Sequence, residues 1–242
     1  GSEMCIRDSK NSSAAESKVI TVSPKSDTYK KKYMNTSWFT EQTRSYYVLR
    51  SYLEYFSNIG GGELHLKKGT YNLQFPLYIP SNTTVIFEDG VTIKRQDKGT
   101  LFILCSYNDV NTGKKFYGYN GVHDIKIIGR GKVVFDKEFG GNAAILMGHT
   151  KNILIEGITF ARMSDTSAHF IEMDASNNVE IRNCTFEGST SGGKKEAINL
   201  DVPDPATGGF TWEGSGQDKT ANDTVYIHNN VFKNLTAGVG TH

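Results

Sequence analysis

Two aspartates, Asp174 and Asp201, give the sequence its clearest chemical signal. Each closes a short segment in which apolar and polar residues alternate, Ile171 to Asp174 and Ile198 to Asp201. When two carboxyl groups are held side by side, their mutual repulsion raises the pKa of one of them. Such a pair can cleave a glycosidic bond, because one acid protonates the leaving oxygen while the other activates water or attacks directly. We therefore expect Asp174 and Asp201 to be catalytic.

The elements that would position these aspartates belong to an internal repeat. The segment from Ile153 to Phe160 returns 26 residues later as Val179 to Phe186, and again as Val225 to Phe232. Each copy alternates with period 2, which is typical of a strand with one buried face. A unit of short strands cannot bury its apolar side alone, but it can when it is stacked on copies of itself. The repeat therefore predicts an all-β parallel solenoid.

The same alignment predicts which side chains share a face. Because successive strand residues point to opposite sides, the residues between the core-facing ones must point outward. Strands in a sheet lie about 4.8 Å apart, so outward carboxylates at one level on adjacent turns are close. Two outward columns follow: Leu146, Glu172, Asn199 and Gly240, and beside it Gly148, Asp174, Asp201 and His242.

A helix is expected before the first turn of the solenoid. Between Trp38 and Phe56, four apolar residues fall at helical spacing: Tyr46, Leu49, Leu53 and Phe56. Ser37 or Thr40 would cap its start, and the glycines from Gly60 would end it. Such a helix can cover the otherwise open end of the solenoid.

The chain divides into a tail and one domain. Residues 1–36 begin with a segment that resembles a translated sequencing adapter and continue Lys- and Ser-rich, so we expect a disordered or artefactual tail. Residues 37–242 form the β-helix domain, which we expect to be truncated at its C-terminus because the chain stops in mid-strand.

Composition excludes several classes of function. The 242 residues include 27 Lys and Arg against 26 Asp and Glu, which gives no bulk reason to bind nucleic acid. No apolar run is long enough to insert into a membrane. Three cysteines form no disulfide framework and no zinc pattern, and Cys184 occupies a core position of the repeat. We expect a monomer.

Two segments resemble the opening of pectin-lyase-like β-helix proteins. They are Gly60 to Tyr71 and Leu77 to Thr84, which follow the expected helix. The resemblance covers about residues 37–242 and implies a right-handed parallel β-helix with an N-terminal capping α-helix. Many of these proteins are polygalacturonase-type glycoside hydrolases or polysaccharide lyases. The resemblance thus implies a polysaccharide substrate and a place outside the cell or on its surface.

The polygalacturonase pattern is similar in order to three segments of this chain. That pattern is Asn-Thr-Asp, Asp-Asp and Gly-His-Gly on successive coils, with Arg-Ile-Lys later. This sequence offers Glu172 to Asp174, Asn199 to Asp201 and Gly240 to His242. The resemblance thereby implies the first acid at Asp174, the doublet coil at Asp201 and the histidine role at His242. Residue 200 is Leu, so the doublet is missing, as is Arg-Ile-Lys, and the way in which water is activated stays open.

Further residues around the two columns are candidates for substrate binding. Glu172 and Asn199 would support the aspartates, and His169 and Glu196 align at the upstream edge of the groove. An insert from Pro203 to Asp223 follows Asp201 directly and is placed where a substrate wall would be built. Within it, Phe210 and Trp212 would stack on sugar rings or, alternatively, anchor the loop. The candidate substrate-binding residues are Glu172, Asn199, His169, Glu196, Asp204, Phe210 and Trp212.

Three alternatives to hydrolysis stay open. A lyase would need a Lys or Arg base, which neither column supplies, and commonly Ca²⁺, which oxygen ligands of the acidic cluster would suit. The domain could also be a non-catalytic glycan-binding or adhesin module. Finally, the acids could form an ordinary solvated surface. For hydrolysis we expect no metal and no cofactor.

Overall fold

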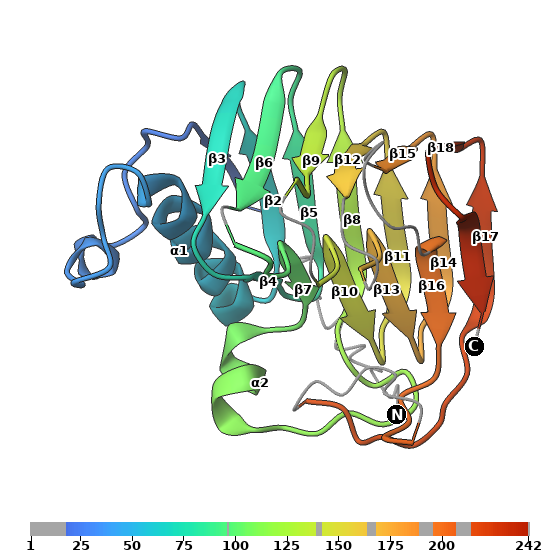
Figure 1. Cartoon of the computed structure of the whole chain (residues 1–242). Coiled ribbons are helices and arrows are strands. Elements are labelled where there is room, and N and C mark those ends of the chain that lie inside the picture. Colours follow the sequence, from blue (N-terminus) through green and yellow to red (C-terminus); the bar gives the residue numbers. More distant parts are fainter. Residues whose placement is uncertain are drawn as a thin grey trace, which may run out of the picture.

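The chain is wound into a right-handed parallel β-helix (Figure 1). The computed structural model describes residues 18–95, 97–138, 142–163, 168–188, 196–206 and 214–241. In this part of the chain, strands form three sheets, all parallel, which we call A, B and C. Each turn of the helix, or coil, adds one strand to A, then one to B, then one to C. The predicted fold class is confirmed.

The three sheets have long stacks of short strands. Sheet A contains β1 (Val19–Val22), β2 (Gly62–Leu66), β5 (Thr83–Phe87), β8 (His123–Gly129), β11 (Lys151–Glu156), β14 (Asn177–Arg182) and β17 (Asp223–His228). Sheet B contains β3 (Gly69–Leu73), β6 (Val91–Arg95), β9 (Val134–Asp136), β12 (Thr159–Met163), β15 (Thr185–Gly188) and β18 (Val231–Lys233). Sheet C contains β4 (Leu77–Ile79), β7 (Phe102–Leu104), β10 (Ile145–Gly148), β13 (Ile171–Asp174), β16 (Glu196–Asp201) and β19 (Ala237–Thr241).

The repeat sets the register as predicted. Ile153 pairs with Val179, which pairs with Val225, so homologous positions stack from coil to coil. Inside, Phe160 and Phe186 stack with ring centroids 4.8 Å apart, close to the spacing of adjacent strands. Cys184 is buried in the same core, as expected. In-register stacking therefore turns one sequence pattern into continuous columns of side chains.

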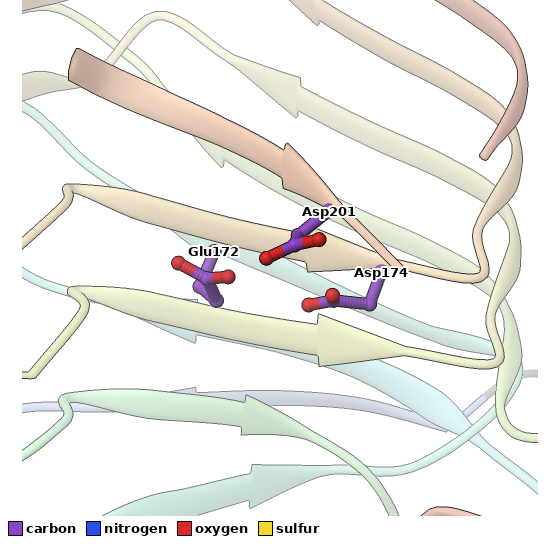
Figure 2. A group of neighbouring side chains, drawn as sticks. All are labelled: Glu172, Asp174 and Asp201. Carbon is purple, nitrogen blue, oxygen red and sulfur yellow. The ribbon is translucent and has the colours of Figure 1, made fainter. Parts of the chain in front are cut away.

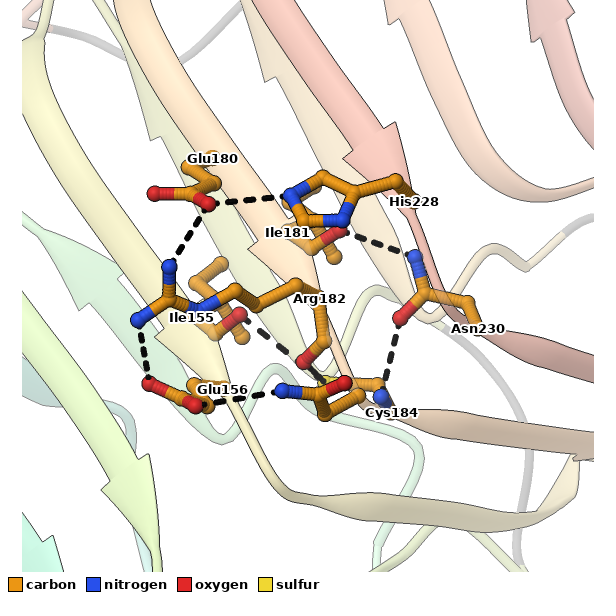
Figure 3. Close-up of polar contacts among 9 residues, drawn as sticks. Ile155, Glu156, Glu180, Ile181, Arg182, Cys184, His228 and Asn230 are labelled. Carbon is orange, nitrogen blue, oxygen red and sulfur yellow. Dashed lines mark hydrogen bonds and ion pairs between the residues drawn. The ribbon is translucent and has the colours of Figure 1, made fainter.

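A polar network on the outer face of sheet A links three coils (Figure 3). Arg182 on β14 lies 3.0 Å from Glu156 Oε2 on β11 and 2.8 Å from Glu180 Oε1. His228 Nε2 on β17 lies 2.9 Å from the same Glu180 oxygen. The hydrogen bond from Arg182 holds the pKa of Glu156 below its usual range. Opposite charges on neighbouring strands each contribute roughly 0.2–1 kcal/mol, so the network supports the register.

Helix α1 (Arg44–Ile59) covers the first coil. Its apolar face is buried against β3 and β4, and Gly60 ends it with φ +88°, as predicted. The start differs from the prediction, because the helix begins at Arg44 and its N-cap is Thr43. Thr43 Oγ1 donates to the carbonyl of Trp38 (3.0 Å), which holds the preceding residues in a turn. Ser37 and Thr40 are therefore not the caps.

The expected tail over residues 1–36 is wrong for its second half. β1 pairs in parallel with β2 and adds a strand to sheet A, and Val22 is buried in the core. The amide of Tyr29 donates to Ser51 Oγ of α1 (2.8 Å), and a 3-10 helix follows at Lys31–Met34. Residues 18–36 thus belong to the domain because they bury apolar side chains against its first coil. Residues 1–17 lie outside the described part.

Two long connections leave the same corner of the coil, after sheet C and before sheet A. The first contains α2 (Tyr107–Thr112) and runs from β7 to β8, and the second runs from β16 to β17. Both lie beyond the ends of the sheet C strands, at the bottom of Figure 1. No helix in the described residues is long and apolar enough to cross a membrane.

Candidate functional site

Three carboxyl groups meet at the end of sheet C (Figure 2). Glu172 and Asp174 lie two residues apart on β13, and Asp201 lies opposite Asp174 on β16. One oxygen of each carboxyl lies within 4.8 Å of the others. The intervening Met173 is buried in the hydrophobic core, so all three acids point away from it. The predicted pairing of Asp174 with Asp201 is therefore confirmed in its geometry.

Asp174 departs from the expectation of a solvated outer wall. Its exposed fraction is 0%, and neither of its carboxyl oxygens has a hydrogen-bond partner among the described residues. Burial, followed by the charges of Glu172 and Asp201, raises the pKa of Asp174 to about 8. A desolvated carboxyl beside two like charges favours its neutral form. At neutral pH this environment favours the protonated form of Asp174.

Asp201 is held in place by the chain on either side of it. One carboxyl oxygen, Oδ1, accepts a hydrogen bond from the amide of Val202 (2.7 Å). The side-chain amide of Asn222 donates to the carbonyls of Asp201 (3.0 Å) and Met173 (3.1 Å). The Asn222 Oδ1 accepts from the amide of Ser176 (2.9 Å). Asn222 thus ties together the ends of β13 and β16, the strands that carry the two aspartates.

Glu172 is oriented by Asn199 of the next coil and by His169 of its own coil. Asn199 Nδ2 donates to Glu172 Oε1 (3.0 Å), across the predicted column. His169 Nε2 lies 3.7 Å from Glu172 Oε2, and His169 Nδ1 donates to the carbonyl of Glu196 (3.0 Å). The predicted neighbours His169 and Glu196 therefore do lie together, beside the acidic cluster.

The insert after β16 binds back onto itself and onto the other long connection. Asp204 accepts a hydrogen bond from the amide of Ala206 (2.9 Å) and lies 3.1 Å from Lys219 Nζ. These contacts hold the pKa of Asp204 below its usual range. Its carboxyl is thus engaged by residues of the insert, and the binding of substrate by Asp204 stays a prediction. Phe210, Trp212 and His242 lie outside the described residues.

A buried histidine fastens the two long connections to the coil corner. His149 Nδ1 donates to the carbonyl of Gly118 (2.8 Å), and its Nε2 lies 2.8 Å from Ser215 Oγ. The His149 amide also donates to the carbonyl of Asp174 (3.2 Å). His149 is thus bonded to both long connections and to the backbone of Asp174.

Sequence reasoning missed both corner residues, Asn222 and His149. The only signal for Asn222 is an Asn at the end of the insert, directly before the next repeat begins at Asp223. His149 carries no periodic signal at all, because its partners lie 31 and 66 residues away.

The arrangement combines a neutral acid with adjacent carboxylates. A protonated carboxyl can donate to a leaving oxygen, and a carboxylate nearby can attack or activate water. Three oxygen-bearing groups within 4.8 Å of one another also match the ligand set that Ca²⁺ prefers. Neither outward column carries a Lys or Arg that would act as the base of an elimination.

Comparison with known proteins supports the fold but assigns no function. No family model matches the chain, and a search of the curated proteins finds no match either. Two solved structures of PfbA, a surface adhesin of Streptococcus pneumoniae, align with TM-scores of 0.60 and 0.61 at 19% identity. They cover 87% and 92% of this chain, which spans 48% and 57% of theirs.

A candidate glycosyl hydrolase from Parabacteroides merdae aligns with a TM-score of 0.47 and 15% identity, over 91% of this chain and 97% of that one. This last similarity is too low to carry an argument. The two PfbA structures show that the present chain shares the parallel β-helix fold.

Proposed function

We propose that the chain hydrolyses glycosidic bonds of a polysaccharide at the cluster of Glu172, Asp174 and Asp201. The observation that supports this most is the buried Asp174 carboxyl, whose pKa is raised to about 8 beside a second carboxyl. Two carboxyl groups whose environments differ are the usual basis for assigning an acid and a base. Asp174 acts as the general acid, and Asp201 acts as the base or nucleophile.

The short carboxyl separation favours one stereochemical course. Retaining glycosidases hold their carboxyl groups about 5–5.5 Å apart, whereas inverting enzymes need roughly 6.5–9.5 Å to admit a water. The nearest oxygens of Asp174 and Asp201 lie within 4.8 Å of each other. This spacing favours Asp201 as the nucleophile, with Asp174 as acid and then base.

The remaining residues support the reacting pair. Asn199 and His169 hold Glu172 in place, and Glu172, with 17% of its side chain exposed, marks where solvent reaches the cluster. Glu196, beside His169, extends this edge toward the substrate. We place the protein outside the cell or on its surface, where polysaccharides occur, and as a monomer. The similarity of its fold to a surface adhesin supports this location.

The test is a screen for new reducing ends with uronate-containing and neutral polysaccharides. We expect turnover by the wild type, and a loss of about 10²–10⁴-fold in Asp174→Asn and in Asp201→Asn, as removal of general acid–base catalysis implies. Full activity in both variants would refute the assignment. Binding without turnover, unchanged in both variants, would instead identify a glycan-binding or adhesin module.

A second candidate is a cation-assisted polysaccharide lyase. The observation in its favour is that three carboxyl groups, one of them with two unpartnered oxygens among the described residues, meet within ligand range. Glu172, Asp174 and Asp201 would hold a Ca²⁺, which neutralises the uronate carboxylate of a substrate. Products that absorb in the ultraviolet and activity that a chelator abolishes would favour this candidate.

A further inference from the structure

A cavity lies near the first coils of the β-helix, apart from the acidic cluster. Its volume is about 460 Å³, which falls within the range of roughly 300–1,000 Å³ that is usual for small-molecule sites. Three parts of the chain form its walls: the C-terminal end of α1, the turn between β4 and β5, and the first long connection, which contains α2. Figure 1 shows α2 next to the end of α1. None of the three acids of the cluster lines this cavity.

The walls of the cavity are bonded to one another. At the turn between β4 and β5, Asn82 Nδ2 donates to the carbonyl of Gly60, which ends α1 (3.1 Å). In the first long connection, Asn108 Nδ2 donates to Asn58 Oδ1 on α1 (3.0 Å). Walls that are already joined need little ordering when a ligand binds, so less of the binding free energy is lost. The cavity is therefore preformed.

Most residues that line the cavity are polar and uncharged. They include the three asparagines Asn82, Asn108 and Asn120 and three serines. An amide group donates through its nitrogen and accepts through its oxygen, and a hydroxyl group does both. Among the described residues, the side-chain amide of Asn120 and the hydroxyl of Ser57 have no hydrogen-bond partner. Such a lining suits a ligand that carries many hydroxyl groups.

The charged groups of the lining are paired. Lys114 Nζ lies 3.4 Å from Asp109 Oδ1, and Asp109 Oδ2 accepts a hydrogen bond from the hydroxyl of Ser106 (2.6 Å). His123 Nδ1 lies 2.7 Å from Asp124 Oδ2. Lys114 is the one lysine among the described residues that line the cavity, so a phosphate or carboxylate would have to compete with Asp109 for it. The lining therefore favours an uncharged ligand.

The apolar residues of the lining offer a ligand little surface. Phe56, Phe116 and Val122 line the cavity, but each is at least 96% buried. An apolar molecule gains binding free energy in proportion to the apolar area that it removes from water. Little such area is left here, which excludes an apolar ligand.

We infer that this cavity binds a neutral saccharide of one or two units. At roughly 30 Å³ per water molecule it has room for about 15 waters, and a hexose unit has about 12 non-hydrogen atoms. The sugar hydroxyls exchange hydrogen bonds with Asn108 and Asn120 of the first long connection and with Ser57 of α1. This binding site goes beyond the proposed hydrolysis and does not depend on it, so that either can fail alone.

The experiment measures the binding of cellobiose, xylobiose and digalacturonate by isothermal titration calorimetry. The protein is the Asp174→Asn variant, in which the proposed hydrolysis is removed. We expect at least one neutral disaccharide to bind with a dissociation constant of about 1 mM or lower, and digalacturonate to bind at least tenfold more weakly. Absence of binding by both neutral disaccharides, or tighter binding of digalacturonate, would overturn the inference.

Two further substitutions, made in the same protein, assign the binding to this cavity. Asn120→Ala removes one sugar contact and should lower the affinity about three- to tenfold. Asn111→Ala is the matched control, because Asn111 is an exposed asparagine of α2 that does not line the cavity. Ser57→Trp fills the cavity and should abolish binding.

Unchanged affinity in both Asn120→Ala and Ser57→Trp would overturn the inference, because the sugar would then bind elsewhere. If Ser57→Trp does not fold, the comparison of Asn120→Ala with Asn111→Ala decides. The reducing-end screen of polysaccharides remains the separate test of hydrolysis, and its outcome leaves this binding site unaffected.

Discussion

Replacing Asp174 by Asn should stabilise the protein while it removes activity. The pKa of this carboxyl rises from 3.8 to about 8 on folding, because the folded state buries it beside Glu172 and Asp201. Below pH 4 the group is protonated in both states, and its contribution to stability is fully present. As pH rises toward 8, the unfolded chain releases the proton and the folded protein retains it, so stability falls.

The expected size follows from the shift. One pKa unit corresponds to about 1.4 kcal/mol, so at pH 7 ionisation of Asp174 in the unfolded state costs the fold up to roughly 4 kcal/mol. Asn resembles the neutral carboxyl and has no such proton to lose. The Asn variant should therefore unfold at a higher urea concentration than the wild type at pH 7, and at nearly the same concentration at pH 4.

The assay is urea unfolding at intervals of one pH unit between pH 4 and pH 8. Asp27→Asn is the control, because it makes the same substitution at a side chain that is 92% exposed. Parallel curves for the wild type and Asp174→Asn across this range would refute the reasoning, because they would mean that Asp174 ionises alike in the folded and unfolded states.

Three further predictions concern the same corner. If the acidic cluster binds Ca²⁺, the ion at 100 times its dissociation constant should stabilise the wild type by about 2.7 kcal/mol. The Asp174→Asn variant should be unaffected. Equal melting temperatures of the wild type with and without Ca²⁺ would argue against the site. Asn222→Ala should cost roughly 1–3 kcal/mol of stability and should also lower kcat. Asn230→Ala is the control, because it loses similar hydrogen bonds, to Ile181 and Cys184, far from the acids, and it should cost stability alone. Equal losses of kcat in the two variants would disprove a positioning role for Asn222. Nuclear magnetic resonance of the first-formed product should show a retained anomeric configuration, and inversion would exclude Asp201 as the nucleophile.

The sequence predicted the pairing of strands wherever it contains the repeat. A period of two within each strand and 26 residues between the first two copies determine which residues stack, so the pairing of Asp174 with Asp201 follows from the amino-acid sequence alone. In-register parallel pairing leaves no freedom once one pair of strands is aligned, since a slip by one residue would expose the core face. The same logic placed Glu172 across from Asn199.

The two long connections, from β7 to β8 and from β16 to β17, carried no such information. The stretch from Asn108 to Asn120 is mostly polar in sequence, yet Phe116 within it completes a hydrophobic cluster with Ile103 and pairs with Ser215. That bridge joins segments far apart in the chain, with no period to align them. The burial of Asp174 was missed for the same reason, because its corner is completed by Asn222 and His149, whose contacts are set by tertiary packing.

The short strand β1 has a practical consequence for anyone who shortens the chain. An exposed strand edge offers unpaired amides and carbonyls to other molecules and is a common starting point for aggregation. β1 occupies that edge of β2, and the residues after it close over α1, where Tyr29 stacks on Tyr55. A protein begun at residue 37, as the sequence alone would suggest, would leave this edge of β2 bare and should self-associate more strongly than one begun at residue 18.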